Sequence, residues 1–172
     1  MTRRCIMIIP EFEDSNRIEA IREKYDPLYG TVKPHITLVF PFSSDLTKDE
    51  LRAHISSALS GFNQFPLLMR GISARREPDG CYIFLDVAEG GEIIRRISGR
   101  LNEGALAKYK SERYDAYAPH ITLGKFPDEA ALQCALARIG EFPYEFSTTV
   151  RSVNVENIEE DGSSAIEIIL QL

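Results

Sequence analysis

A five-residue string, Pro-His-Ile-Thr-Leu, occurs twice in this chain of 172 residues, at positions 34–38 and 119–123. The two copies lie about half a chain apart and contain two of the three histidines in the sequence. Isoleucine and threonine favour strands, and proline is accepted at the first residue of a strand. Each copy therefore predicts the beginning of a strand.

The alternation of side chains along a strand decides which residues of each copy lie together. Successive side chains point to opposite faces, so His35 and Thr37 share one face, and His120 and Thr122 do the same in the second copy. The isoleucine and leucine of each copy point the other way and anchor the strand in a core. Two such strands facing each other would place two imidazoles and two hydroxyls around one small site.

The rest of the sequence alternates between strand and helix signals. We expect strands over residues 4–10, 34–42, 65–76, 81–88 and 119–126, and a closing hairpin formed by 144–158 and 164–172 around a turn at 160–163. Thr47 and Glu50 have the spacing of a capping box and open a predicted helix that runs to about residue 59. Further helices are expected from Asp14 or Ser15 to about 25, from Gly90 to about 104 and over 127–140, with a short helix and a loop over 105–117.

This order of elements is a loose internal duplication with too few units for a solenoid. It predicts an α+β fold with two similar lobes of sheet and helix, related by an approximate two-fold axis. No linker-like composition separates the lobes, so we expect residues 1–172 to form one bilobal domain.

Composition narrows the class of protein. A net charge of −6 and a pI of about 5.2 argue against a protein that coats nucleic acid non-specifically, although a small basic pocket for a nucleotide end remains compatible. The apolar run near the N-terminus is too short for a signal peptide, and no stretch approaches the length of a membrane span. Cys5, Cys81 and Cys134 are far apart, which favours free thiols in a reducing cytoplasm over a metal site.

Two H-[IV]-T-[LI] strings half a chain apart resemble the two-histidine (2H) phosphoesterase superfamily, whose best-known members are 2′-5′ RNA ligases and RNA 2′,3′-cyclic phosphodiesterases. The stretch YDPLYGTVKPHITLVFPF is also similar to a bacterial branch of that superfamily. The resemblance implies antiparallel sheets with helices packed outside, an active-site cleft between the lobes, and a reaction that needs no metal and no cofactor. It also implies that His35 and His120 are catalytic and that Thr37 and Thr122 bind the phosphate oxygens. Val39 follows the first motif and Gly124 the second, so the two walls of the cleft are not symmetric.

The residue types suit this chemistry. Opening a cyclic phosphodiester with water requires a base for the water and an acid for the leaving ribose oxygen, and histidine, with an ordinary pKa of about 6.5, can serve as either. Threonine hydroxyls can donate hydrogen bonds to the non-bridging oxygens, where charge builds up. Either histidine can be the base.

Other residues carry two interpretations each. His54 lies outside the motifs on a predicted helix, and we expect it at the surface. Two interpretations are open for the charged residues Lys33, Lys125, Arg75 and Arg76: they provide positive potential near a phosphate, or they are solvated surface charges. Two are also open for Tyr82, Tyr114 and Tyr117: they stack on a base, or they only pack within the protein. Gly90 and Gly91 before a helix could cradle an anion. The segment 71–75 lacks the closing glycine of a nucleophile elbow, which excludes that type of serine hydrolase.

The sequence therefore predicts a metal-independent phosphodiesterase that acts on 2′,3′-cyclic phosphate or 2′-5′ linked RNA or nucleotides, with ligation as the reverse reaction. The alternative is a non-catalytic module that binds a nucleotide or RNA end in the same cleft. Two intact His/Thr pairs favour the enzyme, because a binding module has no need for two titrating imidazoles. We expect a cytoplasmic monomer whose partner is a nucleotide or RNA-end substrate, without a membrane or a metal.

Overall fold

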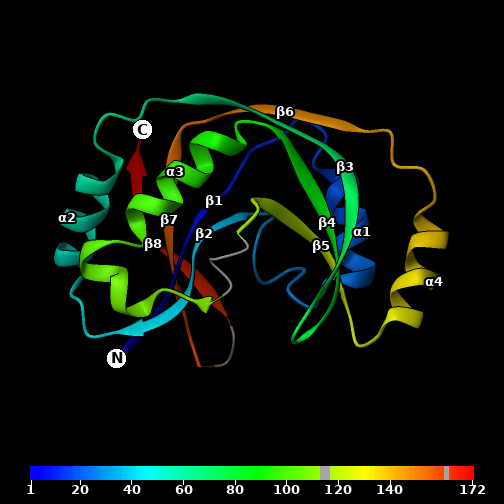
Figure 1. Ribbon diagram of the computed structural model, residues 1–172, viewed down its shortest axis with the longest axis horizontal. Helices are drawn as coiled ribbons and strands as arrows, with labels where there is room; N and C mark the ends of the chain where they lie inside the picture. Colours follow the sequence, from blue (N-terminus) through cyan, green and yellow to red (C-terminus); the bar gives the residue numbers. More distant parts are fainter. Residues whose placement is uncertain (113–116, 161–162) are drawn as a thin grey trace.

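The computed structural model describes residues 1–112, 117–160 and 163–172 and contains two four-stranded antiparallel sheets (Figure 1). The strands at the two ends of the chain form the terminal sheet, in the order β2-β1-β7-β8, with bounds β1 Thr2–Ile8, β2 Ile36–Ser44, β7 Ser152–Ile158 and β8 Ser164–Gln171. The intervening strands form the central sheet, in the order β5-β4-β3-β6, with bounds β3 Phe65–Glu77, β4 Gly80–Glu89, β5 His120–Phe126 and β6 Glu145–Val150. The α+β fold with two antiparallel sheets is thus confirmed.

The helices lie where the sequence predicts them. They are α1 (Asn16–Tyr25), α2 (Lys48–Leu59), α3 (Gly91–Leu101) and α4 (Glu129–Ile139), with a 3₁₀ helix, η1, over Gly104–Tyr109. Thr47 and Glu50 form the predicted capping box, and Asp128 caps α4 by accepting a hydrogen bond from the amide of Ala131. Within the described residues, no helix has the length and apolar character needed to cross a membrane.

Two helices cross from one sheet to the other. Helix α1 joins β1 to β2 of the terminal sheet but packs on β5, and α3 joins β4 to β5 of the central sheet but packs on β2. At the C-terminal end of α3, the Ser98 hydroxyl and the side-chain amide of the C-cap residue Asn102 donate to the Leu38 carbonyl at 2.6 and 3.1 Å. On the other side, the rings of Tyr25 and Phe126 lie 5.6 Å apart. Each motif strand is therefore covered by a helix that connects two strands of the other sheet.

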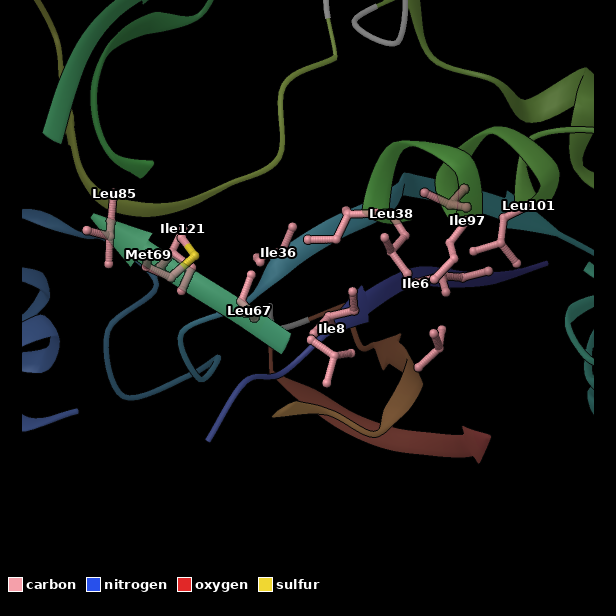
Figure 2. Close-up of a cluster of buried hydrophobic side chains, with 14 of the residues drawn as sticks. Ile6, Ile8, Ile36, Leu38, Leu67, Met69, Leu85, Ile97, Leu101 and Ile121 are labelled. Atoms are coloured by element: carbon pink, nitrogen blue, oxygen red, sulfur yellow. The ribbon is translucent and has the colours of Figure 1, made fainter. Parts of the chain in front are cut away.

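The buried core extends through both sheets. Figure 2 shows side chains of the terminal sheet, the central sheet and α3 in one cluster, among them Ile6, Ile36, Leu38, Met69, Ile97 and Ile121. The four apolar residues of the two motifs, Ile36, Leu38, Ile121 and Leu123, are all buried. This confirms the strand alternation and leaves the histidines and threonines on the other face.

The prediction of one strand over 144–158 is wrong. The chain leaves the central sheet after β6, which pairs with β3, and enters the terminal sheet as β7, which pairs with β1. The buried apolar positions shift from even numbers (Phe146, Val150) to odd numbers (Val153, Val155) across Arg151, which is the signal of the break. Strands β7 and β8 do pair, but residues 161–162 of the predicted turn lie outside the described residues. The lobes are consequently not the two halves of the sequence.

Candidate active site

A cavity of about 450 Å³ is lined by side chains of both sheets. His35 and Thr37 line it from the terminal side, and His120 and Thr122 line it from the central sheet. The structure therefore brings together all four residues that the sequence singles out, although they come from motifs half a chain apart. The motif strands β2 and β5 are edge strands, each on the outside of its own sheet.

The two histidine rings are held in the same way. Nδ1 of His35 lies 2.8 Å from the carbonyl oxygen of Lys33, and Nδ1 of His120 lies 2.7 Å from that of Ala118. A carbonyl oxygen only accepts hydrogen bonds, so Nδ1 carries the proton in each neutral ring. Nε2 of each ring is then the atom that can take up or release a proton in the cavity.

Burial governs the titration of both rings. The half-buried setting of His35 lowers its pKa, and the bond to the Lys33 carbonyl and the nearby Glu156 carboxylate partly oppose this effect. Burial likewise lowers the pKa of His120, opposed by the bond to Ala118 and by Asp86. A positive charge on His35 lowers the pKa of His120 further. The two imidazoles are thus electrostatically coupled across one cavity.

His120 is also fixed by the strand beside it. Its ring stacks on Phe84 of β4, with centroids 3.6 Å apart and planes inclined by 22°. Asp86, the cross-strand neighbour of His120, accepts a 2.8 Å hydrogen bond from the Ser73 hydroxyl. Phe84 belongs to the central sheet, so regular structure helps to set the orientation of the His120 ring.

His35 follows a loop that a buried arginine holds in place. Arg22 is 1% exposed and donates to Asp26 at 2.8 Å, to Glu19 at 3.0 Å and to the Val32 carbonyl at 2.7 Å. Arg22 and Asp26 line a smaller cavity of about 270 Å³ that shares His35 with the first. Sequence reasoning missed this network; its signal is an arginine four residues after Ile18 on the buried face of α1, followed by an aspartate four residues later.

The two motifs are connected through Tyr117. Its hydroxyl donates to the carbonyl oxygen of Thr37 at 2.7 Å, so the segment before the second motif is attached to the strand of the first. Tyr117 and Tyr82 both line the cavity, whereas Tyr114 lies outside the described residues.

Of the basic residues that the sequence offers as phosphate contacts, some line the cavity and others do not. Arg75 lines the cavity, and Arg76 and Lys33 are exposed outside its lining. Lys125 is bound to Asp79 at 2.9 Å and lies over the Tyr82 ring. Among the described residues, no group of three or more histidine, cysteine, aspartate or glutamate side chains is placed to hold a metal ion.

Two further expectations concern residues away from the cavity. The expectation of a surface position for His54 is wrong, because α2 packs on α3; His54 is half-buried and its Nε2 lies 3.0 Å from the Leu101 carbonyl. Gly90 adopts a φ of 88°, and a Cβ there would lie 2.7 Å from the Pro66 carbonyl, so this glycine meets a packing requirement. Neither residue lines the cavity described above.

A family model described as the 2′-5′ RNA ligase superfamily matches residues 10–162. The chain belongs to this superfamily. Among curated proteins, it is 31% identical over 121 residues to a protein of Geobacillus sp. (strain WCH70), covering 70% of this chain and 67% of that protein. It is 30% identical over 146 residues to a protein of Bacillus thuringiensis (strain Al Hakam), covering 81% and 80% of the two chains. Both relatives carry the name "Putative phosphoesterase".

Solved structures of Escherichia coli LigT share the fold. Escherichia coli LigT complexed with 3′-AMP has a TM-score of 0.65 at 16% identity, and LigT complexed with ATP has a TM-score of 0.59 at 17% identity. Each match covers 99% of this chain and 98% of the LigT chain. The predicted membership of the 2H phosphoesterase group is therefore confirmed, and the phosphoesterase assignment follows at the level of the family.

Proposed function

We propose that this 2′-5′ RNA ligase superfamily protein is a metal-independent phosphodiesterase that acts on 2′,3′-cyclic phosphate or 2′-5′ linked nucleotides. The observation that carries the proposal is the matched setting of the two histidines. Both rings use Nδ1 to hold a backbone carbonyl, and both lie in one cavity, so each offers Nε2 to the same ligand.

In the proposed reaction, one neutral imidazole accepts a proton at Nε2 from a water molecule that attacks phosphorus. The other imidazole, protonated, gives a proton from Nε2 to the ribose oxygen that leaves. One phosphorus–oxygen bond forms to water and one breaks to the ribose, and one proton enters and one leaves the protein. Thr37 and Thr122 donate hydrogen bonds to the non-bridging oxygens, where negative charge increases in the transition state.

The cavity supports a nucleotide as the ligand. Its volume of about 450 Å³ lies in the usual range for small-molecule sites. Tyr82 and Phe84 provide an aromatic wall, and Arg75 and Arg3 provide positive charge among the lining residues. The solved relative LigT is complexed with 3′-AMP and with ATP, which supports the same ligand class here.

The proposed setting is a cytoplasmic monomer. The proposed site is assembled from one chain, so it needs no residue from a second copy. Cys5 and Cys81 are buried free thiols, and Cys134 is an exposed one, as expected for a protein kept in a reducing compartment.

The test is turnover of a panel of 2′,3′-cyclic nucleotides, 2′-5′ linked dinucleotides and ADP-ribose 1″,2″-cyclic phosphate in the presence of EDTA. We expect at least one of them to be hydrolysed, and EDTA to leave the rate unchanged. His35→Ala or His120→Ala should each reduce the rate on the order of 10²–10⁴-fold. The double variant should lose less than the product of the two single losses, because the pair acts as a unit.

His54→Ala is the matched control, since it removes an imidazole that lies outside the cavity lining. Normal turnover by the His35 or His120 variant would place the chemistry elsewhere. Nucleotide binding without turnover of any compound would favour the binding-module alternative.

A further inference from the structure

A glutamate lies deep in the cavity and has no role in the proposed reaction. Glu156 of β7 is 5% exposed and lines the cavity. Its carboxylate makes no side-chain hydrogen bond or ion pair with another described residue, but its oxygens are not among the buried polar atoms without a partner, so they are reached from the cavity. This carboxylate is therefore placed to accept hydrogen bonds from a ligand.

A second polar group on the same wall also lacks a partner. The Ser164 hydroxyl oxygen of β8 is buried without a hydrogen bond among the described residues, and Ser164 lines the cavity. It pairs in register with Ile158, two residues after Glu156 on the neighbouring strand, and Ile158 also lines the cavity. Glu156 and the unsatisfied Ser164 hydroxyl thus come from adjacent strands of the terminal sheet.

Glu156 and the motif threonine of the terminal sheet lie on different strands. Strand β1 lies between β2 and β7, with Met7 opposite Thr37 and Cys5 opposite Glu156. Two strand spacings amount to about 10 Å. Glu156 acts on His35 through space, and its carboxylate would repel the phosphate, so we expect a different group of the ligand to contact it. A group attached to that phosphate through a sugar would reach it.

The opposite wall is aromatic. Tyr82 and Phe84 of β4 line the cavity, with ring centroids 5.6 Å apart. Aromatic side chains offer stacking surfaces to nucleobases. Phe84 already stacks on His120, so Tyr82 is the ring left for a planar base, whose edge would then face Glu156 and Ser164 on the other side.

We propose that Glu156 and Ser164 form a subsite that recognises N–H donors on the base of the nucleotide whose phosphate is held by the two motifs. A carboxylate accepts two parallel hydrogen bonds. Guanine presents two adjacent donors on its Watson–Crick edge, N1–H and the N2 amine, whereas adenine and cytosine present an amine and uracil a single imide N–H. The subsite favours guanine. This inference rests on the proposed function for the location of the phosphate.

The test compares hydrolysis of the four 2′,3′-cyclic nucleoside monophosphates by the wild-type protein and by Glu156→Gln. We expect the wild type to prefer the guanosine substrate over the uridine one by roughly 5- to 150-fold in kcat/KM, the usual range for one bidentate base contact. Glu156→Gln should reduce this preference through KM, with kcat changed little. Ser164→Ala should weaken the preference as well.

Glu159→Gln is the matched control, because Glu159 is an exposed carboxylate three residues after Glu156 and lies outside the cavity lining. It should leave the base preference unchanged. If Glu156→Gln does not fold, Ser164→Ala decides alone, and an unchanged preference in that variant overturns the proposal.

Calorimetric titration with 3′-GMP, 3′-AMP, 3′-CMP and 3′-UMP separates this inference from the proposed function. Tighter binding of 3′-GMP that Glu156→Gln abolishes supports the subsite even if none of the cyclic compounds is hydrolysed. Equal affinity for the four bases overturns it. A uniform loss of kcat for all bases in Glu156→Gln, with a shifted pH profile, also overturns it, because the carboxylate would then act on His35.

Discussion

Each histidine of the proposed catalytic pair uses one ring nitrogen for structure and leaves the other for chemistry. The bond from Nδ1 to the carbonyl two residues earlier is present in both motifs, so the shared proline does more than start a strand. Lys33 and Ala118, the residues before Pro34 and Pro119, are extended by steric contact with the proline ring. Their carbonyls then lie within reach of the histidine that follows.

The pH dependence of activity follows from the burial of these two rings. The active state carries one proton on the pair, and its population is largest midway between the two pKa values. Both pKa values are lowered from 6.5. The kcat/KM profile should therefore be bell-shaped, with an optimum below about 6.5, and the rate should fall at neutral pH as the acid loses its proton. A profile of kcat/KM with an optimum above neutrality would contradict this prediction.

Arg22 should contribute strongly to stability and to activity. Replacing it with methionine leaves Asp26 buried without its partner, and breaking such a pair costs about 3–5 kcal/mol. The loop before His35 would also lose its attachment at the Val32 carbonyl, so turnover should fall with stability. Urea denaturation and turnover at low temperature measure the two effects.

Arg17→Met on the same helix is the control for the Arg22 variant, since Arg17 is exposed. It should change the free energy of unfolding by less than about 0.5 kcal/mol. Equal effects of the two substitutions would show that the buried network has no special role.

At the scale of elements, the motif strands should depend on their buried leucines. Leu38 and Leu123 are 1% and 0% exposed. Truncating either to alanine should lower the free energy of unfolding by about 2–5 kcal/mol, through lost burial and the cavity that remains. Denaturant unfolding measures the effect, and a midpoint that stays at the wild-type value in both variants would contradict the packing described here.

The contact between α1 and β5 should be sensitive to a single methyl group. A Cβ at Gly124 would lie 2.8 Å from Cβ of Tyr25 and 3.0 Å from the Phe126 ring. Gly124→Ala should therefore destabilise the protein by about 1–3 kcal/mol, the usual cost of overpacking. Gly61→Ala is unsuitable as a control because the positive φ of Gly61 would strain an alanine. The comparison is therefore made with Ala130→Gly, a substitution at an exposed position on α4, and thermal melts measure both variants. A Gly124→Ala protein with a wild-type melting temperature would show that the interface can relax.

Local signals in the sequence were sufficient for most elements and for the four motif residues. The capping box at Thr47, the glycine before α3 and the alternation around His35 are all short-range patterns, and each has its predicted effect. Sheet partners are different, because a strand pattern shows which face is buried and not which strand lies beside it. That is why the division at Arg151, the crossing of α1 and α3, and the position of Glu156 in the cavity wall required the structure.

At the scale of the whole molecule, the crossed helices join the two sheets into one body. Each sheet covers its motif strand with a helix supplied by the other, so we expect residues 1–172 to unfold in a single transition. Native-state hydrogen exchange tests this through the slowest amides of β1 and β4, which should exchange with the same free energy. If β4 stays protected under conditions in which β1 exchanges freely, the two sheets are separate folding units.

The terminal sheet combines strands from both ends of the sequence, and this has a consequence for synthesis of the chain. Translation delivers β1 and β2 first and β7 and β8 last, after every strand of the central sheet. Until then, β1 has an unpaired edge of the kind to which other chains can add. Glu156 and Ser164 enter the cavity wall in the same final stretch. The nascent protein is therefore most exposed to aggregation while it still lacks part of its proposed binding site, and both conditions end when β7 pairs with β1 and β8 with β7.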